Sequence, residues 1–186
     1  MMAPANANLE ALCEIKAAHP PSTDWWFFPS EQKTRVQGFL GTGRIFIVGV
    51  RPSKCEWEED HPNRRALYDL LATEGAENYH LTDFFKRRAF AGEPSEEMLR
   101  ENDFDEHLQV FHREIELLRP LAILAMGDAF DLVKTHTNLG IKITKVMHFG
   151  AVRYGKLVEF QARLRGAIRE ARCAPVSNDQ GSHPGR

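Results

Sequence analysis

Short apolar segments alternate along this chain with stretches of helical periodicity. The segment at residues 44–50, RIFIVGV, is apolar nearly throughout and rich in β-branched side chains. That pattern is typical of a strand covered on both of its faces. Residues 78–84, 121–126 and 142–147 form three further short segments that we expect to be strands.

The other stretches carry apolar residues at helical spacing. In the clearest, residues 104–118, apolar side chains follow one another at intervals of four and three, as in an amphipathic helix. Weaker patterns predict helices at residues 9–18, 31–40, 63–75, 128–136 and 157–171. Strands alternating with helices indicate an α/β protein. We expect a three-layer α/β/α sandwich with a central, mostly parallel four-stranded sheet.

Length and composition indicate one globular domain. The 186 residues suit a single domain, and 42% hydrophobic with 27% charged residues is an ordinary globular composition. We expect an N-terminal helical extension at residues 1–22, the α/β domain at residues 23–172, and a disordered tail rich in Pro, Gly and Ser at residues 173–186. A monomer is the expected oligomeric state.

Cysteine usage and hydropathy argue against several protein classes. Cys13, Cys55 and Cys173 lack the close spacing of a metal site or a disulfide framework, and sparse cysteines are typical of reduced thiols in a cytoplasmic protein. No segment approaches the roughly 18 apolar residues of a membrane span. The N-terminus lacks the basic region and apolar block of a secretory signal. We therefore expect a cytoplasmic protein with no metal and no membrane partner.

Basic residues gather after three of the expected strands, although the formal net charge is only −2. They are Arg51, Lys54, Arg64 and Arg65, then Lys86, Arg87 and Arg88, then His148 and Arg153. The carboxyl ends of parallel strands meet at one edge of a sheet, where ligands bind. Acidic residues collect instead at residues 93–106. This asymmetry predicts a phosphate or polyanion at that edge; the alternative is a set of solvated loop residues.

Five motifs follow one another through the α/β region. They are VGVRPS at 48–53, HPNRR at 61–65, LTDFFKRR at 81–88, RPLAILAMGDAFDLV at 119–133 and HFGAVRYG at 148–155. In this order and spacing they resemble the uracil-DNA glycosylase superfamily, and in particular its mismatch-specific uracil/thymine-DNA glycosylases. The resemblance runs from Arg44 to Arg172.

The resemblance implies a uracil-DNA glycosylase-like fold, DNA as the partner and no cofactor. It implies hydrolysis of the bond between a deaminated or mispaired base and its deoxyribose, after the base has left the stack and entered a pocket. Such a pocket stabilises negative charge on the departing base, and a carboxylate or amide near the sugar positions water. By its place in the last motif, His148 is the expected donor to the base oxygen.

Other motif positions imply binding roles. Gly49 and Pro52 shape the first loop, Ser53 binds phosphate, and Trp57 is the aromatic residue placed to stack on the base. After the last strand, the loop that holds Val152 and Arg153 wedges into the duplex and contacts phosphate. The full set of expected base and phosphate contacts is Gly49, Val50, Arg51, Pro52, Ser53, Trp57, Asn63, Arg64, Thr82, Lys86, Arg87, Arg88, Phe149, Gly150, Val152 and Arg153.

The largest departure from the family is at Val50 and Arg51. Relatives carry an acidic or amide residue in this pair, and that residue holds the attacking water. Valine cannot hold water, and a guanidinium only donates hydrogen bonds. A substitute acid is expected at Asp83 or in the acidic run that contains Glu59, unless that run is merely a solvated loop.

Three functions stay open at this point. The first is a DNA glycosylase that uses a substitute acid. The second is a catalytically inactive member of the same fold that binds nucleic acid or a nucleotide. The third is an unrelated α/β enzyme acting on a phosphorylated small molecule, which is weakened by the absence of a G-x-G-x-x-G or G-x-x-x-x-G-K-[ST] loop.

Overall fold

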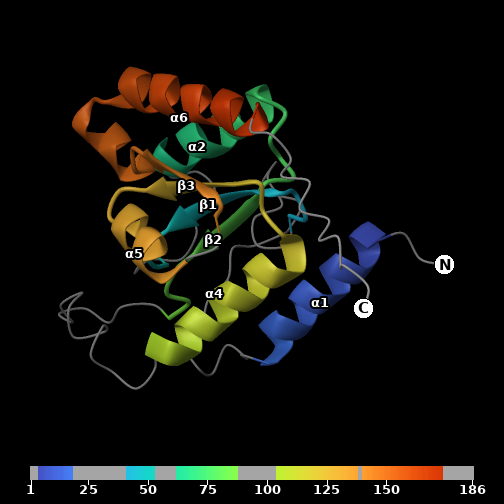
Figure 1. Ribbon diagram of the computed structural model, residues 1–186. Coiled ribbons are helices and arrows are strands. Elements are labelled where there is room, and N and C mark those ends of the chain that lie inside the picture. Colours follow the sequence, from blue (N-terminus) through green and yellow to red (C-terminus); the bar gives the residue numbers. More distant parts are fainter. Residues whose placement is uncertain (1–3, 19–40, 53–61, 88–103, 138–139, 174–186) are drawn as a thin grey trace, which may run out of the picture.

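The computed structural model describes residues 4–18, 41–52, 62–87, 104–137 and 140–173 (Figure 1). Within these residues the sheet consists of β1 (Ile45–Gly49), β2 (His80–Asp83), β3 (Ala122–Met126) and β4 (Lys142–Val146). The helices are α1 (Pro4–Ala18), α2 (Pro62–Thr73), α4 (Phe104–Leu118), α5 (Ala129–His136), the 3₁₀ helix η3 (Phe149–Tyr154) and α6 (Leu157–Arg172).

The four strands form one sheet in the order β2-β1-β3-β4, and every pairing is parallel. Figure 1 shows α2 and α6 on one face of this sheet and α4 and α5 on the other, with α1 packed outside α4. The expected three-layer α/β/α sandwich with four strands is therefore confirmed, and the sheet is wholly parallel.

Burial explains why the central segments read as continuous apolar runs in the sequence. Every residue of β1 and β3 is buried, because helices cover both faces of these strands. Burying one such Ile, Leu or Phe side chain stabilises the fold by roughly 1.5–3 kcal/mol. β4 differs, since it lies at the edge of the sheet and Lys142 and Lys145 are exposed there. Lysines on an edge strand discourage pairing with a strand of another chain.

The helix boundaries follow the apolar periodicity closely. The amphipathic pattern at residues 104–118 is α4, as expected, and its buried side chains include Phe111 and Ile115. α1 begins at Pro4, earlier than the pattern from residue 9 indicates. The expected helix at residues 31–40 and the tail beyond residue 173 lie outside the described residues. In the described part of the chain, no helix has both the length and the apolar character needed to cross a bilayer.

Candidate functional site

The carboxyl ends of the four strands lie at one edge of the sheet, and main-chain hydrogen bonds hold the loops that leave it. In register, Gly49 of β1 lies opposite Asp83 of β2. The pairing continues beyond the strands, because the amide of Phe84 donates to the carbonyl oxygen of Gly49 (2.9 Å) and the amide of Phe85 donates to that of Val50 (2.9 Å). The first two loops are therefore anchored side by side.

Asp83 is an ionisable residue at this edge, and it packs directly against β1. Its side chain is buried, with 5% exposure. Its Oδ1 lies so close to the place of a Cβ atom on Gly49 that the two would collide, and the methyl group of Met126 is 3.7 Å from that place. Glycine at position 49 thus makes room for the Asp83 carboxyl group. This contact gives a physical reason for the glycine of the first motif.

A buried polar cluster lies beneath the end of β2. Lys86 Nζ is 2.8 Å from one carboxylate oxygen of Glu114 and donates to the other at 2.9 Å. Lys86 Nζ also donates to the main-chain oxygen of Asp83 (2.6 Å) and to the hydroxyl of Thr82. The Thr82 hydroxyl in turn donates to Glu114 at 3.0 Å. Glu114 belongs to α4, so the cluster ties β2 and its following loop to that helix.

His80 extends this cluster at the base of β2. Its Nδ1 donates to the main-chain oxygen of Gly41 (2.9 Å), and its Nε2 lies 3.6 Å from Glu114 Oε2. Its ring packs against Phe46, with centroids 4.5 Å apart. Alternate residues of a strand face opposite sides, so His80 and Thr82 face α4, whereas Asp83 faces the other side.

The acid strengths of these groups are altered by their surroundings. Burial raises the pKa of Asp83 to about 7; Lys86 opposes this and Glu114 adds to it. Burial also disfavours ionised Glu114, but attraction to Lys86 and hydrogen bonds from His80 and Lys86 outweigh it and keep the pKa of Glu114 below its ordinary value. Burial lowers the pKa of Lys86, against the attraction of Glu114. Asp83 is thus an acid whose charge changes near neutral pH.

His148 follows β4 and is the N-cap residue of η3. Its Nδ1 accepts a hydrogen bond from the amide of Gly150 (3.0 Å), and its ring stacks on Phe149 with centroids 4.3 Å apart. The side chain keeps contact with solvent, yet desolvation by its surroundings lowers its pKa, with Asp128 acting in the opposite direction. A neutral ring whose Nδ1 accepts carries its proton on Nε2. Nε2 is therefore a hydrogen-bond donor near neutral pH.

Asp83 and His148 lie at opposite sides of the same sheet edge. Asp83 ends β2 and His148 follows β4, with the ends of β1 and β3 between them. Three strand spacings correspond to about 14 Å between their main chains. Gly127, at the end of β3, brings that strand's loop to His148, because a Cβ atom there would lie 3.6 Å from the His148 Cβ. The structure does not bring the two residues into contact, and a ligand that touches both has to span the edge.

Several residues that we expected to contact DNA are buried and do not lie at the surface. Thr82 and Lys86 are buried, with 2% and 1% exposure, because their polar atoms bond to the cluster around Glu114. Asn63 and Arg64 are buried at the start of α2. Lys86 therefore does not present its ammonium group to a phosphate, contrary to the expectation from charge.

The remaining described positions differ in exposure. Pro52 is buried, Arg51 and Arg87 are half-buried, and Arg153 is exposed. Val152, expected in the wedge, packs against the hydrophobic core. The adjacent Tyr154 has 68% exposure and holds the Arg153 guanidinium over its ring at 4.7 Å. Ser53, Trp57, Glu59 and Arg88 lie outside the described residues.

Glu114 and His80 are site residues that the motifs did not indicate. A signal for Glu114 was present, since it lies three residues after Phe111 and one before Ile115, on the apolar face of α4. A carboxylate at such a position needs a buried partner. Sequence order does not reveal that the partner is Lys86.

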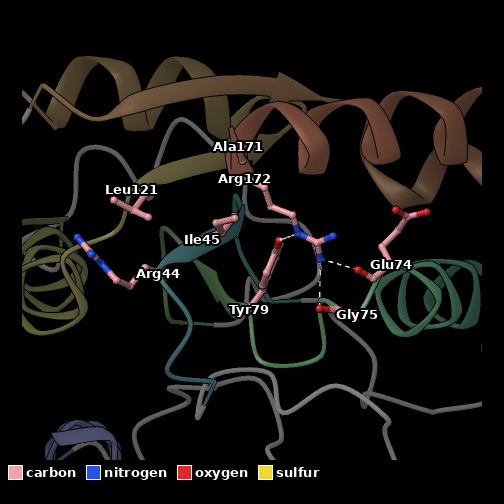
Figure 2. A pocket seen from close by; sticks show the side chains of 8 residues that line it. All are labelled: Arg44, Ile45, Glu74, Gly75, Tyr79, Leu121, Ala171 and Arg172. Atoms are coloured by element: carbon pink, nitrogen blue, oxygen red, sulfur yellow. Dashed lines mark hydrogen bonds between the residues drawn. The ribbon is translucent and has the colours of Figure 1, made fainter. Parts of the chain in front are cut away.

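A pocket of about 510 Å³ lies at the opposite end of the sheet (Figure 2). Arg172 reaches into it and donates to the Tyr79 hydroxyl (2.8 Å) and to the main-chain oxygens of Glu74 (2.5 Å) and Gly75 (3.2 Å). These carbonyls follow the end of α2, so Arg172 acts as a helix cap. Among the described residues, no group of three or more His, Cys, Asp or Glu side chains is placed to hold a metal ion.

Comparison of the sequence with protein-family models and with curated proteins found no match.

Proposed function

We propose that this chain hydrolyses the N-glycosidic bond of a deaminated or mispaired base in DNA, with Asp83 as the base that activates water and His148 as the donor to the leaving base. The observation that carries the proposal is the Asp83 carboxyl group, buried against Gly49 at the carboxyl edge with a pKa of about 7. A general base works best when its pKa is near the working pH. Asp83 therefore replaces the acid or amide that Val50 and Arg51 do not supply.

The two residues act on opposite sides of the bond. Water attacks C1′ of the deoxyribose and gives a proton to Asp83, while the C1′–N bond breaks and its electron pair stays on the base. The base leaves as an anion, and the Nε2–H of His148 donates to the oxygen that carries the developing charge. The neutral ring favoured by the lowered pKa of His148 suits a hydrogen-bond donor that does not need to ionise.

Basic side chains around the edge support DNA as the substrate. Arg51 follows β1, Arg87 follows β2 and Arg153 lies in η3, so all three are on loops or turns that leave the carboxyl edge. Contacts of arginine with phosphate position DNA without reading its sequence. Replacing Arg153 with Ala should weaken binding at all sequences about equally and lower the salt slope by roughly one unit.

A nucleic-acid binding module is the second candidate. It is favoured by Arg51, which stands at the position of the family's water-holding pair and is half-buried there. A guanidinium at that position repels a cationic sugar but attracts a phosphate or a base anion. The two candidates share their binding residues and differ only in whether Asp83 reaches water at the sugar.

A glycosylase assay separates them. Single- and double-stranded oligonucleotides that carry uracil, mismatched thymine, hypoxanthine or xanthine are incubated with the protein and then treated with alkali to reveal abasic sites. We expect cleavage of one of these substrates, and Asp83→Asn should lower its rate by about 10²–10⁴-fold. His148→Ala should also lower it. The matched control is Asp131→Asn, which changes an exposed acid on α5.

Each other outcome has a definite meaning. Cleavage that survives Asp83→Asn at the wild-type rate contradicts the role of Asp83. Absence of cleavage together with tight, salt-sensitive binding of the same oligonucleotides identifies the binding module. Absence of both cleavage and binding contradicts both candidates.

A further inference from the structure

We propose that Lys86 and Glu114 are positioning residues, which hold the end of β2 so that the Asp83 carboxyl group is presented beside Gly49. The catalytic consequence of this inference rests on the proposed function, but the positioning itself does not. Neither residue is expected to touch a substrate, because both side chains are buried, with 1% and 0% exposure.

The first step is a main-chain clamp. The Lys86 ammonium group donates to the main-chain oxygen of Asp83 at 2.6 Å, three residues back along the chain. The same ammonium group is fixed by the Glu114 carboxylate, at 2.8 Å, and by the Thr82 hydroxyl. The amide of Lys86 also donates to His107 Nδ1 (3.3 Å). The turn after β2 is thus held from α4 through Glu114 and His107.

The second step is the direction of the Asp83 side chain. Thr82 faces α4 and bonds to Glu114, so its neighbour Asp83 faces the opposite side of the sheet. On that side its carboxyl group fills the space that Gly49 leaves open. The clamp and the carboxyl group therefore lie on different sides of one main-chain segment. Holding the main chain of Asp83 from the α4 side therefore fixes the direction of its carboxyl group on the other side of the sheet.

The third step is electrostatic. Burial is the largest influence on Asp83 and disfavours its ionised form. Lys86 favours the ionised form, and Glu114 disfavours it. A buried ion pair is weak support for stability, since well-packed apolar residues often replace such a pair without loss. Stability alone therefore does not account for charges in this place. The charged groups that act on the Asp83 carboxyl group are Lys86 and Glu114. Two further titratable groups, His107 of α4 and His80 of β2, contact Lys86 and Glu114 in turn, and Arg51 lies in the adjoining loop after β1.

The experiment titrates Asp83 directly in the full chain. Carboxyl carbons are labelled with ¹³C, and the Asp83 signal is assigned from its loss in Asp83→Asn. In Lys86→Met the midpoint should rise by about one pH unit, because a favourable positive charge is lost. In Glu114→Gln it should fall by a smaller amount, and in the double variant Lys86→Met/Glu114→Gln it should return close to the wild-type value. Glu159→Gln breaks an exposed pair with Arg163 and should leave the midpoint unchanged.

The double variant also separates the clamp from the charge. It restores neutrality but lacks the donor to the Asp83 carbonyl, so its cleavage rate at saturating substrate should fall by about tenfold or more while its KM stays near wild type. In the single variants the acid limb of the pH–rate profile should move with the NMR midpoint. The NMR readout needs no activity, so a failed glycosylase proposal does not hide the result.

Three results would overturn the inference. One is an Asp83 midpoint that stays at the wild-type value in both single variants or moves in the same direction in both. Another is a folded double variant that cleaves at the wild-type rate. The third is a double variant that cannot fold, because the pair would then serve the fold and not Asp83.

Discussion

At the amino end of the sheet, arginine side chains donate hydrogen bonds to main-chain carbonyl oxygens. The carboxyl end instead holds a carboxyl group and an imidazole whose pKa values are shifted. Arg172 caps α2 (Figure 2), and the Nε of Arg44 donates to the main-chain oxygen of Arg119 after α4 at 2.9 Å. In these contacts, guanidinium groups that are always charged donate to carbonyl oxygens at the carboxyl ends of two helices. Burial instead raises the pKa of Asp83 to about 7 and lowers the pKa of His148. Side chains that change protonation near pH 7 are the ones suited to acid–base chemistry.

Both ends also contain an ion pair, but the two pairs differ in burial. Lys86 and Glu114 are fully buried at the carboxyl end, whereas Arg165 and Glu74 at the amino end have 39% and 13% exposure. Water screens the second pair and does not reach the first. The comparison teaches that the ion pair at the carboxyl end is shielded from water, whereas the pair at the amino end is not.

The largest expected effect is a loss of stability when a substitution breaks the buried pair of Lys86 and Glu114. Lys86→Met leaves the Glu114 carboxylate buried without its ammonium partner, so the free energy of unfolding should fall by about 3–5 kcal/mol. Arg165→Ala at the other end should cost less than about 1 kcal/mol, because that pair is partly exposed. Urea unfolding at pH 7 measures both. Equal losses in the two variants would contradict the distinction between the two ends.

The next largest effect is the contribution of Asp83 to the pH dependence of the free energy of unfolding. Its pKa is about 7 in the folded protein, against an ordinary value of 3.8. The stability that its protonated form contributes is fully present below pH 3.8 and is lost as the pH rises through about 7. Asp83→Asn should therefore match wild type near pH 4 and exceed its free energy of unfolding by up to about 4 kcal/mol at pH 8.

Urea unfolding of wild type and Asp83→Asn at several pH values measures this difference. Asp131→Asn is the control, since that carboxylate is exposed. A constant difference between pH 4 and pH 8 would show that the Asp83 pKa is not raised.

The comparison of the two ends also shows which features the sequence reveals. The layers, and the order of strands and helices along the chain, follow from local periodicity, as α4 illustrates, because apolar spacing reports burial directly. Asp83 was one of several candidate acids, and the sequence could not select it. The selection depends on its register with Gly49, which joins positions far apart in the chain.

The expected surface role of Lys86 failed for the same reason. A lysine after a strand usually reads as a solvated loop residue, and only its packing against Glu114 of α4 shows otherwise. Pairings between distant segments are not encoded in local composition. The fold was therefore more predictable than the site.

A smaller effect concerns the room that β1 leaves for the acid. A Cβ atom on Gly49 would collide with Asp83 Oδ1, so Gly49→Ala should cost about 1–3 kcal/mol and displace the carboxyl group. Gly166→Ala is the matched control, because that glycine lies within α6 with open space around it and should gain up to about 1 kcal/mol. Thermal or urea unfolding checks stability, and the ¹³C signal of Asp83 checks its position. An unchanged Asp83 signal in Gly49→Ala would contradict the contact.

The smallest expected effect lies at the amino end and tests whether the two ends are independent. Arg172→Ala removes donors to the carbonyl oxygens after α2 and to the Tyr79 hydroxyl, and it should cost about 1 kcal/mol. Arg169→Ala, on the same helix and exposed, should cost less. Because Arg172 lies across the length of the sheet from Asp83, neither variant should move the Asp83 midpoint or the cleavage rate. A shifted midpoint in Arg172→Ala would mean that α2 transmits a change from its carboxyl end to the functional edge, and the amino-end pocket would then belong to the site.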